Sequence, residues 1–235
     1  MNWSEVVQSI KPHIVRIETP TGHGTGFHCL HNHDGTWCGI ATAAHVVSYA
    51  EEWQQPIRLR AADGKTVMLY TADRAITIDH ATDSAVIVFQ KNQFPLPANI
   101  FPLFPSDQPI PVGSEVGWLG FPAIEPYELC FFSGSVSAHK SARRAYLIDG
   151  VAINGVSGGP VIYHHATKGA QIVGTVSAYY ANRSGGEALP GLLLAQDVSH
   201  FNSTAQHIQS IDQARAQKES FEREASQLSP NVEQT

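Results

Sequence analysis

A proline-rich segment divides the chain into two parts of similar length. Residues 93–113, QFPLPANIFPLFPSDQPIPVG, hold six of the fourteen prolines. Proline lacks a backbone N–H and its ring fixes φ, so this segment can be neither a helix nor a central strand. We therefore predict a connector over 96–112 that joins an N-terminal part, 1–95, to a C-terminal part, 113–200.

Short apolar runs separated by turn residues fill both parts. After a short helical segment broken at Pro12, the N-terminal part holds six predicted strands: 13–18, 24–30, 36–47, 56–62, 66–79 and 83–90. The C-terminal part holds six more: 114–122, 127–139, 144–153, 160–165, 170–180 and 191–198. Asp34-Gly35 and Asp63-Gly64 are typical hairpin turns. This pattern predicts an all-β protein of two six-stranded antiparallel barrels.

The composition changes from residue 201 onward. Residues 201–235 are helix-prone, with Ser203 as the predicted cap and a thin apolar stripe of Ile208, Ile211 and Phe221. We expect a helix followed by a frayed tail. The helix can dock on the body or bind a partner protein, and its charged residues beyond Ala214 are typical of a solvated face.

Charge and cysteine content exclude several classes of protein. The net charge is −6 and no cluster of Lys and Arg is present, which argues against a nucleic-acid partner. No run approaches the roughly 18 apolar residues of a membrane helix, and the N-terminus lacks the apolar core of a signal peptide. Three cysteines are too few for a disulfide framework. We therefore expect a cytoplasmic protein with no membrane partner.

The stretch GVSGGP, residues 155–160, surrounds the hydroxyl of Ser157 with glycines. Glycine tolerates positive φ and close approach, which suits either an ordinary tight turn or the seat of a nucleophile. A nucleophilic serine needs a base and a carboxylate that orients it. His45 ends an apolar run, and Asp83 begins one, with Asp79 and Asp73 as competing carboxylates.

Three short motifs resemble those of trypsin/chymotrypsin-like serine proteases. They are TAAH at 42–45, DSAVI at 83–87 and GVSGGP at 155–160, in the family's order of His, Asp and Ser. Residues 172–177 resemble the strand that binds substrate, and residues 190–192 resemble the closing strand. EVVQSIKPHIVRI and DSAVI look most like the HtrA branch, although the tail is too short for a PDZ-type domain. The resemblance implies two Greek-key barrels with the site between them and a C-terminal helix.

The resemblance also assigns roles to residues. It makes His45 the general base and then the acid, Asp83 the residue that orients it, and Ser157 the nucleophile. The N–H groups of Gly155 and Ser157 would form the oxyanion hole. The residues implied to bind substrate are Val151, Ala152, Asn154, Ser177, Ala178 and Tyr179.

The same resemblance predicts the specificity of the primary pocket. Val151 would form its base and supplies no carboxylate, while Tyr179 would narrow its mouth. We expect small or medium apolar residues, such as Ala, Val or Leu, before the cut bond, because an unpaired buried charge is costly. A two-residue shift would instead place Asp149 in the pocket.

Val156 departs from the pattern of secreted relatives. Those relatives carry an acidic residue there, which receives the new N-terminus after zymogen cleavage. Since Val156 cannot do so and no propeptide precedes the predicted fold, we expect no activation by N-terminal insertion.

Histidine and cysteine crowd one predicted hairpin, 23–38: His23, His28, Cys29, His31, His33 and Cys38. A zinc site is the alternative to a structural role, since both residue types bind zinc. The spacing fits no standard two-plus-two pattern, so we predict no metal and no cofactor.

These observations together predict a serine endopeptidase acting on protein or peptide substrates. A binding module on the same fold, with a misaligned triad, is the alternative. An esterase would share the chemistry.

Overall fold

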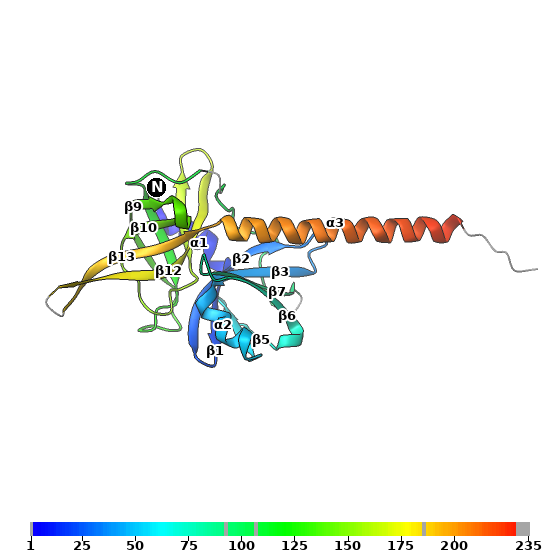
Figure 1. The fold of residues 1–235 in the computed structure, drawn as a ribbon, viewed down its shortest axis with the longest axis horizontal. Coiled ribbons are helices and arrows are strands. Elements are labelled where there is room, and N and C mark those ends of the chain that lie inside the picture. Colours follow the sequence, from blue (N-terminus) through cyan, green and yellow to red (C-terminus); the bar gives the residue numbers. More distant parts are fainter. Residues whose placement is uncertain (1, 92–93, 106–107, 185–186, 229–235) are drawn as a thin grey trace, which may run out of the picture.

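The computed structural model describes residues 2–91, 94–105, 108–184 and 187–228. Figure 1 shows two units of β-structure side by side, with a long C-terminal helix that extends past both. The connector lies between the units in the sequence, and its residues 106–107 fall outside the described part. So does the predicted frayed end of the tail, 229–235.

The N-terminal unit is one antiparallel sheet of seven strands, in the order β5-β4-β1-β2-β3-β7-β6. It follows α1 (Trp3–Ile10) and the 3-10 turn η1 (Lys11–His13). Its strands are β1 (Ile14–Thr19), β2 (Gly22–His31), β3 (Trp37–Ala43), β4 (Ile57–Ala61), β5 (Thr66–Leu69), β6 (Arg74–Asp79) and β7 (Ser84–Gln90). The sheet curls into a half-barrel that does not close, and it has seven strands where six were predicted.

Two local features explain the difference from the predicted strands. The predicted strand 66–79 is interrupted by a 3-10 turn, η2 (Thr71–Asp73), where the Asp73 carboxylate accepts a hydrogen bond from the Tyr70 N–H at 3.0 Å. The predicted strand 36–47 ends at Ala43, because helix α2 (Ala44–Glu52) begins there. His45 therefore lies in the first turn of a helix and not at the end of a strand.

The C-terminal unit is a closed barrel in the order β10-β13-β12-β11-β8-β9. Its strands are β8 (Glu115–Gly120), β9 (Cys130–Lys140), β10 (Ala145–Asp149), β11 (Pro160–His165), β12 (Gly169–Ser184) and β13 (Glu187–Asp197), with a short 3-10 turn, η4 (Ser141–Arg143), between β9 and β10. All six strands predicted for this part are present. The structure confirms a mostly-β protein of two curled sheets with one C-terminal helix.

The buried apolar side chains form three clusters, and one of them joins the two units. One fills the N-terminal sheet and another fills the barrel. The third lies between them and combines residues of α1, β2, the connector, β8, β11, β12 and α3. Phe27, Leu119 and Phe201 are among its fully buried members. Because side chains of both units share this cluster, their relative position is fixed by apolar burial.

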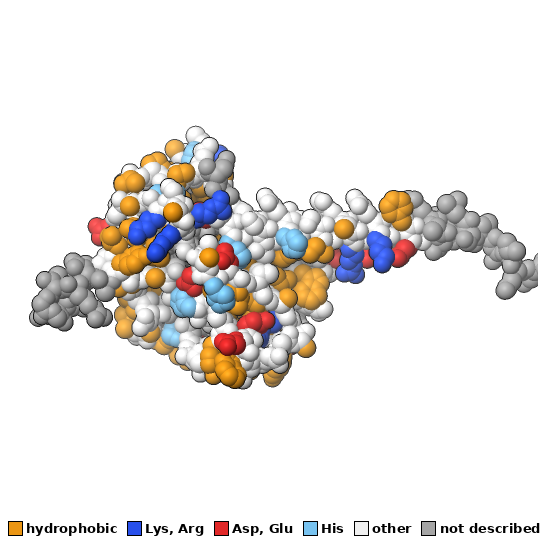
Figure 2. All heavy atoms as spheres, viewed as in Figure 1, with side chains coloured by type: hydrophobic (Ala, Val, Ile, Leu, Met, Phe, Trp, Pro, Cys, Tyr) orange, Lys and Arg blue, Asp and Glu red, His pale blue; other side chains and the backbone are white. Residues whose placement is uncertain are grey.

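Helix α3 (Ser199–Leu228) begins four residues before the predicted cap Ser203. Asp197 accepts a hydrogen bond from the Ser199 N–H at 3.0 Å, so Asp197, and not the predicted Ser203, satisfies a donor at the start of the helix. Phe201 and Ile208 pack against the shared core, and Asp212 accepts from the His33 N–H at 2.9 Å. Beyond this point charged side chains follow the exposed helix (Figure 2). No described helix is long and apolar enough to cross a membrane.

Candidate active site

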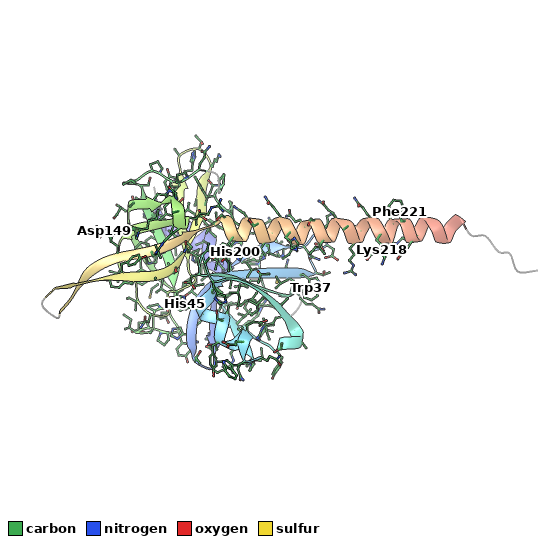
Figure 3. All side chains as sticks on the ribbon, in the orientation of Figure 1. Trp37, His45, Asp149, His200, Lys218 and Phe221 are labelled. Atoms are coloured by element: carbon green, nitrogen blue, oxygen red, sulfur yellow. The ribbon has the colours of Figure 1, made fainter. Side chains whose placement is uncertain are left out.

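The three predicted catalytic residues lie where the two units face each other. His45 is the second residue of α2, Asp83 immediately precedes β7, and Ser157 lies in the turn before β11. Strand pairing brings the first two together, because Ala43 at the end of β3 pairs with Ser84 at the start of β7. Figure 3 shows His45 at the junction between the N-terminal sheet and the barrel.

Asp83 binds His45 through both the ring and the backbone. His45 Nδ1 lies 2.9 Å from Asp83 Oδ2 and 3.1 Å from Oδ1, and the His45 N–H donates to Oδ1 at 3.0 Å. The Asp83 carbonyl also accepts the Ala44 N–H at 3.0 Å. The carboxylate thus satisfies a donor at the start of α2 while it orients the imidazole.

Ser177 on β12 is a second partner of Asp83. Its hydroxyl donates to Asp83 Oδ2 at 2.6 Å. The prediction placed Ser177 in the substrate wall; this contact with the carboxylate had no signal in the sequence. Burial opposes ionisation of Asp83, but hydrogen bonds from His45 and Ser177 hold the pKa of Asp83 below its ordinary value. The group is therefore a carboxylate at neutral pH.

The two competing carboxylates have other partners. Asp79 accepts from the Ala81 N–H at 2.9 Å and from the Thr82 hydroxyl at 2.8 Å, and lies 3.8 Å from His200 Nδ1 on α3. Asp73 closes the turn before β6. Of these three acids, Asp83 is the one that contacts His45.

The backbone around Ser157 is fixed by hydrogen bonds to four successive carbonyls. The carbonyl of Asn154 accepts from the Ala123 N–H at 2.7 Å, and that of Gly155 accepts from the Thr25 hydroxyl at 2.8 Å. The carbonyl of Val156 accepts from the Gly159 N–H at 2.9 Å, and that of Ser157 from the Thr25 N–H at 2.8 Å. In a trans peptide the N–H points opposite to the carbonyl, so these bonds also orient the amides.

Two N–H groups in this stretch have no acceptor among the described residues, those of Gly155 and Ser157. The other two, of Val156 and Gly158, donate to the carbonyls of Ile153 and Val176 at 3.1 and 2.7 Å. The Ser157 hydroxyl makes no hydrogen bond with any residue that the structure describes, His45 included.

The glycines of the motif allow this close packing. Gly155 and Gly158 have φ of +92° and +84°, a region that favours glycine. A Cβ on Gly155 would lie 2.4 Å from the Phe121 carbonyl oxygen, and one on Gly158 would lie 2.1 Å from the Thr25 carbonyl oxygen. Larger residues would therefore displace the strands that hold Ser157.

The residues predicted to bind substrate differ in their exposure and contacts. Val151, Asn154 and Ala178 are exposed, and Ala152 packs against the barrel core. Tyr179 bends onto β13, where its hydroxyl accepts the Gly191 N–H at 2.5 Å. Asp149 is exposed at the end of β10 and lies well away from His45 in Figure 3.

The hairpin rich in histidine and cysteine does not assemble metal ligands. Cys29 and Cys38 are buried in different apolar clusters, and all three cysteines are free. Among the described residues, no group of three or more His, Cys, Asp or Glu side chains is placed to hold a metal ion.

Comparison with known proteins gives a family. Residues 24–174 match the model of the trypsin-like peptidase domain. Among solved structures, the fold is similar to that of Deg5, with a TM-score of 0.62 and 20% identity over 85% of this chain and 90% of that one. No curated protein matches the sequence. Since the family model covers more than half of the chain and all three catalytic candidates fall within its limits, this protein belongs to the trypsin-like peptidase domain family.

Proposed function

We propose that the protein is a serine endopeptidase with His45, Asp83 and Ser157 as its catalytic triad. The observation that carries the proposal is the backbone of residues 154–157. Its four carbonyls all accept hydrogen bonds, while the N–H groups of Gly155 and Ser157 have no acceptor in the described part of the chain. Two free donors beside a serine form a site for the oxyanion of a tetrahedral intermediate.

The geometry assigns one step to each group. Ser157 Oγ attacks the carbonyl carbon of the substrate and its proton passes to His45 Nε2, while the oxyanion accepts from the two free N–H groups. His45 then donates this proton to the leaving amine, which gives an acyl-enzyme. A water molecule repeats the sequence and releases the acid. Asp83 stays ionised throughout and stabilises the imidazolium through Nδ1.

The absent Ser157–His45 hydrogen bond belongs to the unliganded enzyme in this proposal. Catalytic hydrogen bonds are often long before substrate binds and tighten in the Michaelis complex. His45 is half exposed, so its ring has room to turn on the fixed Nδ1–Asp83 contact. The same observation favours the second candidate, a binding module whose triad never aligns.

We also propose that the site needs no activation by N-terminal insertion. The Val156 side chain is fully buried in the barrel core and has no charge to offer a new N-terminus. The bonds that orient its neighbours come from Thr25, Ala123 and Gly159 instead. These contacts support a site that is formed in the intact chain.

Substrates in this proposal are proteins or peptides, bound along β12 beside Ser177, Ala178 and Tyr179. Val151, Ala152 and Asn154 line the opposite side. The free state of all three cysteines supports a reducing, intracellular location.

A fluorophosphonate probe tests the proposal, because it reacts only with an activated serine. We expect stoichiometric labelling of Ser157, located by mass spectrometry, and no labelling of Ser157→Ala. A folded wild-type protein that resists the probe would establish the binding module instead.

A further inference from the structure

We propose that Thr25 is a positioning residue that holds the oxyanion hole in shape, a role that rests on the proposed function. Thr25 lies on β2 in the N-terminal sheet, and its side chain is completely buried. Each polar group of Thr25 already has a hydrogen-bond partner in the protein, so none of them is left to bind a substrate. Its effect would therefore pass through Gly155 and Ser157.

The hydroxyl of Thr25 joins two segments of the C-terminal barrel. It donates to the Gly155 carbonyl at 2.8 Å and accepts from the Phe121 N–H at 3.0 Å. Its backbone N–H donates to the Ser157 carbonyl at 2.8 Å. The Thr25 side chain thus holds the peptide that joins Gly155 to Val156, and its backbone holds the peptide that follows Ser157. These two peptides are directly bonded in the chain to the ones that carry the free N–H groups of Gly155 and Ser157.

The remaining polar group of Thr25 anchors it within its own sheet. The Thr25 carbonyl accepts from the Thr42 hydroxyl at 2.7 Å. Thr42 lies on β3, which leads directly into α2 and His45. The chain of contacts from Thr42 through Thr25 to Gly155 therefore connects the base-bearing unit to the hole.

Glycines make room for Thr25 on the barrel side. A Cβ on Gly120 would lie 2.9 Å from the Thr25 hydroxyl, and one on Gly158 would lie 2.1 Å from its carbonyl oxygen. Backbones can approach this closely only without side chains. The contact is thus built from both units.

Gly155 explains why a positioning residue is needed. Its φ of +92° joins two peptide planes at the most permissive residue type, so neither plane is held by local sterics. The plane before it is held by Ala123, and the plane after it by Thr25 and by the Val156 N–H. Without the Thr25 hydroxyl, the buried Gly155 carbonyl loses its hydrogen-bond donor, and only the bond from the Val156 N–H to the Ile153 carbonyl still holds the second plane.

Three variants of the full chain separate positioning from stability. Thr25→Val removes the hydroxyl at constant shape, and Thr25→Ser keeps it. Thr204→Val is the matched control, because Thr204 is also buried but lies on helix α3, outside both the substrate strand and the turn that holds Ser157. The probes are Ac-Ala-Ala-Ala 4-nitroanilide as substrate, and the aldehyde and alcohol of the same peptide as inhibitors; only the aldehyde forms an oxyanion on Ser157.

We expect Thr25→Val to lower kcat on the order of 10²-fold with little change in KM, the scale of one lost oxyanion donor. Affinity for the aldehyde should fall by the same factor and affinity for the alcohol should not. Thr25→Ser should stay within about threefold of wild type because it has the same hydroxyl, and Thr204→Val should be unchanged. If Thr25→Val does not fold, Thr25→Cys, a weaker donor, should show an intermediate loss.

An unchanged kcat in Thr25→Val would overturn the proposal, as would an equal loss of aldehyde and alcohol binding. Crystal structures of the wild type and Thr25→Val give a readout that needs no activity: the peptide between Gly155 and Val156 should rotate only in the variant. A wild type that neither cleaves the substrate nor reacts with a fluorophosphonate refutes the proposed function, and the crystal structures still decide the role of Thr25.

Discussion

The two ends of strand β2 differ in whether their buried polar side chains have hydrogen-bond partners. At the first end, near the active site, every polar group of Thr25 has a partner, and His23 Nε2 lies 3.2 Å from the Phe121 carbonyl. At the other end, His28 is fully buried, and neither of its ring nitrogens has a partner among the described residues. The same strand therefore fixes one region by hydrogen bonds and the other by ring packing.

The histidine end groups three rings, called the histidine stack below: His13 lies nearly parallel to His28, and His31 meets His28 edge-on. The centroids of His13 and His28 are 5.9 Å apart, and those of His28 and His31 are 4.2 Å apart. His31 Nε2 lies 3.3 Å from the Pro97 carbonyl of the connector, so the stack lies beneath the segment that joins the two units. Burial, and then the neighbouring His31 and His13, lower the pKa of His28 to about 3.

Comparison of His45 with His28 shows how neighbouring groups determine whether a histidine can carry a charge. His45 is half exposed and faces a carboxylate that can stabilise its charged form. His28 is buried and faces two other histidines, so burial and charge repulsion together oppose its charged form. We expect pH to act on catalysis at one site and on folding at the other.

The largest expected effect comes from the carboxylate at the active-site end. Asp83→Asn should lower kcat on the order of 10⁴-fold, because an amide favours the wrong imidazole tautomer. Asp79→Asn is the matched control, since Asp79 pairs with Thr82 and His200 instead. Steady-state kinetics of both variants decide the assignment. A large loss in Asp79→Asn with an active Asp83→Asn would reverse it.

Acid should next lower the activity through His45. A protonated imidazole cannot accept the serine proton, so kcat/KM should fall about tenfold per pH unit on the acid limb. The measurement is a profile from about pH 5 to pH 8, the range in which histidine side chains ordinarily titrate. A flat profile over this range would contradict the role of His45 as base.

Acid should separately lower stability through the histidine stack. The pKa of His28 is about 3 in the folded chain, against an ordinary 6.5. The unfolded chain therefore binds a proton first, so stability is full above pH 6.5, declines as the pH falls, and levels off near pH 3. For His28 alone, the free energy of unfolding should drop by about 2 kcal/mol between pH 6.5 and pH 5.

His28→Leu tests this separation. Urea titrations at pH 7 and pH 5 should show less loss of stability in the variant than in the wild type, while the pH profile of kcat/KM stays the same. His80→Leu is the control, because His80 is exposed. An equal acid sensitivity of His28→Leu and wild type would show that the stack does not govern acid stability.

The smallest expected effect concerns specificity. Because the Tyr179 hydroxyl accepts the Gly191 N–H at 2.5 Å, the ring lies over β13 at the proposed pocket. Tyr179→Gly should raise kcat/KM for peptides with Phe or Leu before the cut bond by about tenfold relative to Ala, the scale set by added apolar contact in a pocket. Unchanged relative rates would place Tyr179 outside the pocket. If the wild type instead cleaves after Arg or Lys and Asp149→Ala does not, the base of the pocket is Asp149, two residues before Val151.

Local sequence patterns were sufficient to predict the strands of the C-terminal barrel, which are short and bounded by turns. They failed where a residue distant in the sequence determines whether a segment is helix or strand. Helix α2 begins at Ala44 because Asp83, 39 residues later, accepts the N–H groups at its start. The interruption between β5 and β6 depends on one carboxylate, Asp73, within an otherwise continuous run.

The active-site motifs could be recognised, but their supports could not. Ser177 and Thr25 are small polar residues within strands, and nothing in their local sequence says that one binds Asp83 and the other Gly155. Tertiary contact alone supplies that information. For the same reason, the spacing of residues 23–38 argued against a metal site but could not show that His28 and His31 pack against each other in the core.

Cleavage of a peptide library by the purified chain tests the central proposal most directly. The library should vary the residue before each bond and be analysed by mass spectrometry, with Ser157→Ala as the control. We predict cleavage by the wild type, mainly after Ala, Val or Leu, and none by the variant. Labelling of Ser157 by a fluorophosphonate without cleavage of any peptide would contradict an endopeptidase and indicate an esterase, and equal cleavage by Ser157→Ala would rule out Ser157 as the nucleophile.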